Sequence, residues 1–135
     1  MSTPASELRA AADKLRKLVA DLPATGWGDR PWHVEECSDT DDMSPCLCIV
    51  AQGEYRDFDQ PQDPLIQYVA DAETVEHGAY IAAMHPGVGT ALADWLDATA
   101  AALEKHAPAE WHARLEPQAL AVARQINATG SPAVG

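Results

Sequence analysis

The sequence predicts an α+β fold: an N-terminal helix, a small antiparallel sheet of about three strands, then three or four C-terminal helices. Three observations predict it. Apolar residues recur at helical spacing at both ends of the chain, β-branched residues gather in short runs between about 31 and 69, and strands do not alternate with helices as in a parallel sheet. At 135 residues, we expect one domain over 1–127 and a disordered tail over 128–135.

The first helix is predicted from Pro4 to about Asp21. Thr3 suits the N-cap, and proline suits the first helical position because its missing N–H has no helical partner there in any case. One face of this helix is apolar, with Leu8, Ala11, Ala12, Leu15, Leu18, Val19 and Leu22 at spacings of three and four. The helix is therefore amphipathic, and Pro23 ends it.

Three short strands are predicted near 31–36, 46–52 and 65–69, because aromatic, β-branched and sulfur-bearing residues concentrate there between polar turns. Three such strands would make a small antiparallel sheet. The first connection carries the acidic run 39–42, which lacks the glycine and the distant glutamate of a calcium loop.

The C-terminal half is predicted to be helical. Asp71 is the expected N-cap of a helix over about 72–84, and Pro86 then starts a new helix over about 86–105. One stripe of that helix carries Val88, Ala91, Leu92, Trp95, Leu96, Thr99 and Leu103, which places Trp95 in the core. Further helical segments are expected to begin near Pro108 and Pro117.

Charge and hydropathy exclude some classes of function. The formal net charge is -12 and the pI is about 4.5, so we expect no direct nucleic-acid binding, which depends on Lys and Arg neutralising phosphates. No stretch approaches the roughly 20 apolar residues of a membrane span, so we expect a cytoplasmic protein without a membrane partner. In that compartment the three cysteines are expected to remain thiols.

The candidate metal ligands are His33, Cys37, Cys46 and Cys48, which fall on two predicted strands and their connection. Four nitrogen and sulfur ligands suit tetrahedral zinc, so zinc is the one candidate cofactor. The spacing differs from the usual C-x2-C, however, and cysteine is commonly a small buried apolar residue. The alternative is therefore that the cysteines are structural and that the protein has no cofactor.

The candidate ligand-binding residues are aromatic: Trp27, Trp32 and Tyr80. Their rings offer a large contact area and a stacking face for a nucleotide-like ligand. Glu73 and His77 are spaced as neighbours on one predicted helix and form a further candidate acid/base pair, with an ordinary surface pair as the alternative. We identify no catalytic motif.

One stretch carries a resemblance to a known family. Residues 69–88, running into 91–96, include Tyr80-Ile81-Ala82-Ala83 and the proline corner at Pro86. This pattern resembles small phage and prophage proteins of the Ead/Ea22-like type and similar uncharacterised proteins of high-GC bacteria. The resemblance implies an accessory protein of a mobile element with a sheet-plus-helices fold, and it implies no reaction.

These observations favour a non-enzymatic binding or regulatory protein of phage type, whose partner is a host protein or a small nucleotide-like ligand. Oligomerisation through an amphipathic helix is a further expectation. One alternative is an acidic mimic of DNA, suggested by the net charge of -12. The other is a zinc-binding protein or metal-dependent enzyme that uses His33 and the cysteines.

Overall fold

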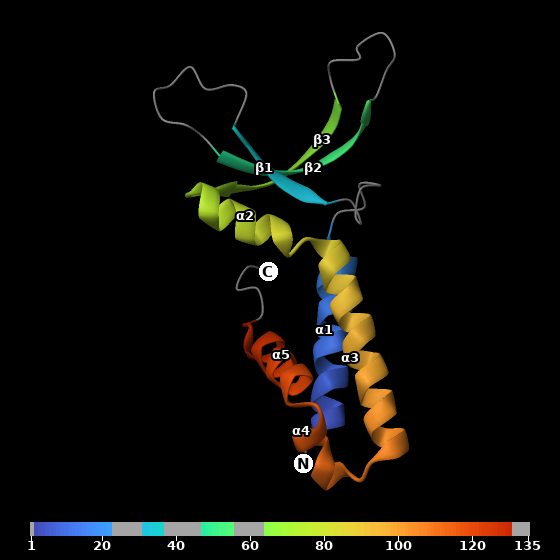
Figure 1. The fold of residues 1–135 in the computed structure, drawn as a ribbon. Helices are drawn as coiled ribbons and strands as arrows, with labels where there is room; N and C mark the ends of the chain where they lie inside the picture. The colour runs from blue at the N-terminus through green and yellow to red at the C-terminus, as the bar shows by residue number, and fades with distance from the viewer. Residues whose placement is uncertain (1, 23–30, 37–46, 56–63, 131–135) are drawn as a thin grey trace. The chain divides into compact units, whose positions relative to one another are not determined.

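The fold is α+β, as the sequence predicts: an N-terminal helix, a three-stranded antiparallel sheet and several C-terminal helices (Figure 1). The computed structural model describes residues 2–22, 31–36, 47–55 and 64–130. Its elements are α1 (Pro4–Ala20), β1 (Trp32–Glu36), β2 (Leu47–Tyr55), β3 (Pro64–Ala72), α2 (Val75–Ala83), α3 (Pro86–His106), a 3-10 turn (Ala109–Trp111), α4 (His112–Leu115) and α5 (Pro117–Ala128).

The chain divides into two compact units, which are described separately. The helical unit combines Met1–Asp21 with Gly89–Gly135 and so contains α1, most of α3, α4 and α5. The sheet unit is Leu22–Val88 and contains the three strands and α2. None of the helices that the structure describes is both long enough and apolar enough to cross a membrane.

The start of α1 confirms the predicted cap. Thr3 has extended backbone geometry, and its hydroxyl accepts a hydrogen bond from the Ser6 N–H at 3.1 Å. The Ser6 hydroxyl in turn accepts from the Thr3 N–H at 2.8 Å, which completes a capping box. Two N–H groups that the helix itself leaves without partners are satisfied in this way.

The core of the helical unit is built largely from alanine. Its buried side chains are Ala5, Leu8, Ala11, Ala12, Ala93, Leu96, Ala100, Leu103, Ala119 and Ala123, from α1, α3 and α5. Helices α1 and α3 run antiparallel, since Arg9 pairs with Glu104 whereas Arg16 pairs with Asp94 and Asp97. Small side chains at these positions allow the helix backbones to approach closely.

The predicted stripe of α3 is confirmed at Leu96 and Leu103, which are buried, and is wrong at Ala91 and Trp95. The buried positions are Ala93, Leu96, Ala100 and Leu103, whereas Ala91 is exposed and the Trp95 residue is 41% exposed. The buried face of α3 combines Leu96 and Leu103 with Ala93 and Ala100, two alanines that the predicted stripe does not include. Trp95 is therefore a surface residue, and it does not belong to the core.

The sheet has strand order β1-β2-β3, so β2 is central. Trp32 pairs with Ala51 and Val34 with Ile49, which places these four side chains on one face because directly opposite residues share a face. Between β2 and β3 the register shifts after Ile49, where the pairing passes from Ala70 to Tyr68. This irregularity is a β-bulge, and it bends the strand.

Helix α2 begins later than the sequence predicts. Asp71 is not its cap, because β3 continues to Ala72 and Asp71 pairs with Cys48 in the sheet. The N-cap is Thr74, whose hydroxyl accepts from the His77 N–H at 3.1 Å. The predicted corner at Pro86 is confirmed, since α3 starts at that residue.

Candidate functional site

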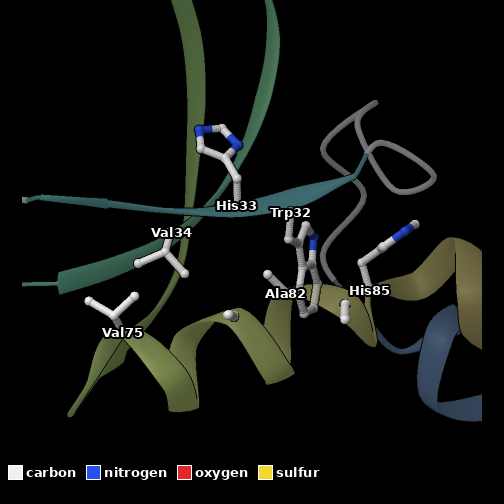
Figure 2. Close-up of a pocket in the computed structure, with 8 residues that line it drawn as sticks. Trp32, His33, Val34, Val75, Ala82 and His85 are labelled. Atoms are coloured by element: carbon white, nitrogen blue, oxygen red, sulfur yellow. The ribbon is translucent and has the colours of Figure 1, made fainter.

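A pocket of about 470 Å³ lies between β1 and α2 within the sheet unit (Figure 2). A volume of this size is typical of sites for small molecules. Apolar side chains provide most of its lining, which comprises Trp32, His33, Val34, Val75, Ala79, Ala82, Ala83 and His85. The pocket is therefore suited to an apolar or aromatic group.

Successive side chains of β1 point to opposite faces of the sheet, and this alternation decides which of them reach the pocket. Trp32 and Val34 are two residues apart and extend from the strand toward α2, whereas the imidazole of His33 points to the other side of the sheet (Figure 2). The Nε2 atom of His33 lies 2.7 Å from Glu35 Oε1, on that opposite side. His33 therefore borders the pocket mainly through its backbone.

Helix α2 provides the opposite wall through residues at helical spacing. Val75, Ala79 and Ala83 are each four residues apart, so they lie along one side of the helix next to the buried Ala82. Gly78 packs directly against Val34 and sets how near the helix comes to the strand. The side chains of α2 that line the pocket after Gly78 are the small Ala79, Ala82 and Ala83.

His85 also lines the pocket, and Figure 2 shows its ring directed away from the Trp32 ring. The Gly87 N–H donates a hydrogen bond to His85 Nδ1 at 3.1 Å. Because Nδ1 accepts this hydrogen bond, the proton of the neutral ring is on Nε2. His85 thus has one fixed tautomer, set by the start of α3.

The aromatic candidates from the sequence separate in the structure. Trp32 lines the pocket. Tyr80 does not, because it lies on the outer side of α2 with 73% of the residue exposed, next to Ile81 and Met84, which are 39% and 49% exposed. Trp27 lies outside the described residues.

The predicted zinc ligands are only partly described. Cys37 and Cys46 lie outside the described residues, and Cys48 is disulfide-bonded, which corrects the expectation that all three cysteines are thiols. Zinc binds the thiolate, so Cys48 would first have to be reduced. Among the residues that the structure describes, no three His, Cys, Asp or Glu side chains form a group able to hold a metal ion. The four-ligand zinc site stays a prediction.

The Glu73 and His77 pair does not form on a helix as predicted, because Glu73 precedes the first residue of α2. The His77 ring instead lies at the cap, with its Nδ1 atom 2.9 Å from the Thr74 hydroxyl oxygen. The His77 side chain therefore contacts the N-cap residue of α2.

Sequence reasoning missed Val75, Ala79 and His85 as pocket residues. The available signal was the composition of α2, which carries apolar residues around almost its whole circumference in the sequence VEHGAYIAA. A helix that is apolar on more than one side has a second apolar surface to cover. Here one side packs on the sheet and the neighbouring side borders the pocket.

No family model, curated protein or solved structure matches the chain. The resemblance of residues 69–96 to phage accessory proteins therefore stays a prediction.

Proposed function

We propose that this chain is a non-enzymatic binding protein and that the pocket between β1 and α2 holds a small aromatic molecule. The observation that carries the proposal is the position of Trp32, whose indole forms one wall of a 470 Å³ pocket with alanines opposite it. An aromatic ligand in that space gains from stacking on the indole and from burial of its own apolar surface.

Two features of the pocket support this proposal. Ala79 and Ala83 are exposed to solvent on the pocket side of α2, so a ligand that lies over them removes apolar surface from water. Trp32 is half-buried and held by its strand, so little side-chain freedom is lost when it stacks on a ligand. The resemblance to phage accessory proteins fits a role in which the protein sequesters or senses a small molecule.

A pocket-filling variant tests the proposal. In Ala79→Phe the new ring occupies the space opposite Trp32, whereas Ala101→Phe places the same ring on an exposed position of α3 in the helical unit. Binding of indole, 7-azaindole and adenosine is measured by ligand-observed NMR titration. We expect the wild type and Ala101→Phe to bind at least one of these probes and Ala79→Phe to lose that binding.

Two results would contradict the proposal. One is that none of the aromatic probes binds the folded wild type. The other is that Ala79→Phe binds them as well as Ala101→Phe does, which would place the binding elsewhere on the protein. Circular dichroism on both variants confirms that each keeps its fold.

A further inference from the structure

β1 is an edge strand of the sheet. In the strand order β1-β2-β3 it pairs with β2 on one side, and no strand that the structure describes pairs with its other side. The backbone of an edge strand presents a row of N–H and C=O groups on its open side, and another extended chain can pair with them. β1 therefore offers a place for one further strand.

The pocket lies beside the open edge of β1. Its lining comes from β1, from α2 and from His85 just after α2, and no described residue of the central strand β2 contributes to it. A space between α2 and the paired strands would be lined by β2 as well, so the pocket lies on the side of β1 that faces away from β2. Figure 2 shows Trp32 and Val34 extending from β1 toward α2, which runs along the strand. β1 and α2 thus form the two sides of a groove.

A peptide strand paired with β1 would place alternate side chains in this groove. Successive side chains of a strand point to opposite faces, and directly opposite residues of paired strands share a face. Peptide side chains opposite Trp32 and Val34 therefore point toward α2. The pocket residues of α2 that border them are exposed to solvent, namely Val75, Ala79 and Ala83. An aromatic side chain opposite Trp32 and an aliphatic one opposite Val34 would remove this apolar surface from water.

One end of the groove is acidic. Glu36 is exposed and lies two residues beyond Val34, so the alternation of β1 places it on the same face of the sheet as Val34. Figure 2 shows Val34 near Val75, the first residue of α2. The exposed Glu73 and Glu76 lie on either side of Val75 in the sequence and add negative charge at this end. A lysine or arginine of the peptide opposite Glu36 would meet a complementary charge.

We propose that the groove between β1 and α2 binds an extended peptide that pairs with β1 and carries the pattern basic-x-aliphatic-x-aromatic. This proposal rests on the proposed function, because the aromatic group that the pocket binds is here a side chain of the peptide. The pattern assumes antiparallel pairing, the more stable kind, in which the peptide runs from Glu36 past Val34 to Trp32. Its backbone contributes hydrogen bonds to β1, and its alternate side chains contribute specificity.

Alternate N-methylation tests the pairing. The probe is the peptide Thr-Lys-Thr-Val-Thr-Phe-Thr with fluorescein at its N-terminus and an amidated C-terminus, and fluorescence anisotropy measures its affinity. In a paired antiparallel strand, only alternate residues direct their N–H groups to the neighbouring strand. N-methylation of one alternate set, either Lys, Val and Phe or the Thr residues between them, should therefore weaken binding by about tenfold or more through lost hydrogen bonds. N-methylation of the other set should leave binding in place.

A charge exchange tests the register. Glu36→Lys should weaken binding of this peptide about two- to fivefold at low salt, and a peptide with Glu in place of Lys should recover the loss. Glu35→Lys is the matched control, because Glu35 is the next residue along β1 and points to the opposite face, where its Oε1 atom lies 2.7 Å from His33 Nε2. This control should bind the peptide as the wild type does. Ala79→Phe should lose the peptide and indole together.

The outcomes separate this proposal from the proposed function. If indole binds in the pocket but the peptide does not, or if both methylated peptides bind as well as the parent, addition of a strand to β1 is overturned and the pocket remains a binding site. Failure of indole and peptide alike overturns both proposals. An equal loss in Glu35→Lys and Glu36→Lys overturns the register. If the peptide fails to bind a wild type that sedimentation velocity shows to be dimeric, a second copy of the chain replaces the peptide as the candidate partner of β1.

Discussion

Gly78 lies so near Val34 that a β carbon added to the glycine would stand 2.8 Å from Val34 Cγ2 and 3.0 Å from Ala72 Cβ. Val34 is β-branched and half-buried on β1, so its methyl groups have little freedom to move aside. The glycine therefore fixes the closest approach of α2 to the sheet. That approach also sets the distance between the two walls of the pocket.

Gly78→Ala is expected to destabilise the sheet unit, against the usual trend. Within a helix, glycine to alanine normally stabilises by about 1 kcal/mol. Here the methyl group overlaps Val34, and overpacking of this kind typically costs about 1–3 kcal/mol. Urea unfolding, followed by Trp fluorescence and circular dichroism, measures the change in the free energy of unfolding.

Gly89→Ala is the matched control, because Gly89 is also a helical glycine and its added β carbon would lie 3.4 Å from Val19 Cγ2, at the edge of ordinary contact. We expect this variant to be as stable as the wild type or more stable. If Gly78→Ala behaves in the same way as Gly89→Ala, the close approach of α2 to β1 is not a constraint on the fold.

The fold class was predictable because its signals are local. The capping residue Thr3, the proline at position 86 and the β-branched run of β2 each determine structure through neighbours in sequence. The start of α2 was not predictable in the same way. Asp71 and Thr74 are both good caps, and pairing of Asp71 with Cys48 in the sheet decided between them.

The candidate site was predictable only in part, because a pocket depends on residues that meet through tertiary packing. Trp32 stood out as an aromatic residue, but Ala79 has no chemistry that marks it. His85 was visible as the residue before a proline, and its tautomer depends on the Gly87 N–H. Ala93 and Ala100 of the helical core were missed for a related reason: alanine gives a weak hydrophobic pattern, although it packs closely.

The burial of Leu96 and the exposure of Trp95 predict unequal losses of stability for these two neighbouring residues of α3. Leu96 is fully buried, so Leu96→Ala is expected to destabilise the protein by about 2–5 kcal/mol through lost burial and the cavity left behind. Trp95 is 41% exposed, so Trp95→Ala should cost less in spite of its larger side chain. Thermal or urea unfolding of both variants compares them. A larger loss of stability in Trp95→Ala than in Leu96→Ala would instead support the predicted stripe, in which Trp95 is buried.

The Arg9 and Glu104 pair makes the stability of the helical unit depend on pH. Arg9 donates two hydrogen bonds to the Glu104 carboxylate, at 3.2 and 2.9 Å. These hydrogen bonds, followed by the charges of Arg9 and His112, lower the pKa of Glu104 from its usual value of 4.5, although partial desolvation opposes the shift. Because the folded state lowers this pKa, the stabilisation is complete above pH 4.5 and is lost as the pH falls through the lowered value.

Glu104→Gln should therefore be less stable than the wild type at pH 7, and the difference should disappear in acid. Both groups are about half exposed, so the effect is small and is best measured as a shift in urea midpoint at low salt. Glu110→Gln, at an exposed carboxylate on the 3-10 turn, removes the same charge and serves as the control. A constant difference across the acid range would exclude Glu104 as the titrating group.

His112 is expected to stabilise the corner between α3 and α4 through one hydrogen bond. It is buried, with 4% of the residue exposed, and its Nε2 atom lies 2.9 Å from the Ala107 carbonyl oxygen. Since a carbonyl only accepts, Nε2 carries the proton, and Nδ1 is buried without a hydrogen-bond partner among the described residues. The ring thus makes one hydrogen bond and leaves one acceptor unsatisfied.

The two substitutions of His112 separate these effects. His112→Leu fills the space but leaves the Ala107 carbonyl without its donor, which we expect to cost about 1–3 kcal/mol. His112→Gln retains an N–H donor near the same position and should lose less. Urea unfolding at pH 8 measures the free energy of unfolding of both variants. If His112→Leu is as stable as the wild type, relief of the buried Nδ1 balances the lost hydrogen bond, and the corner is held by packing alone.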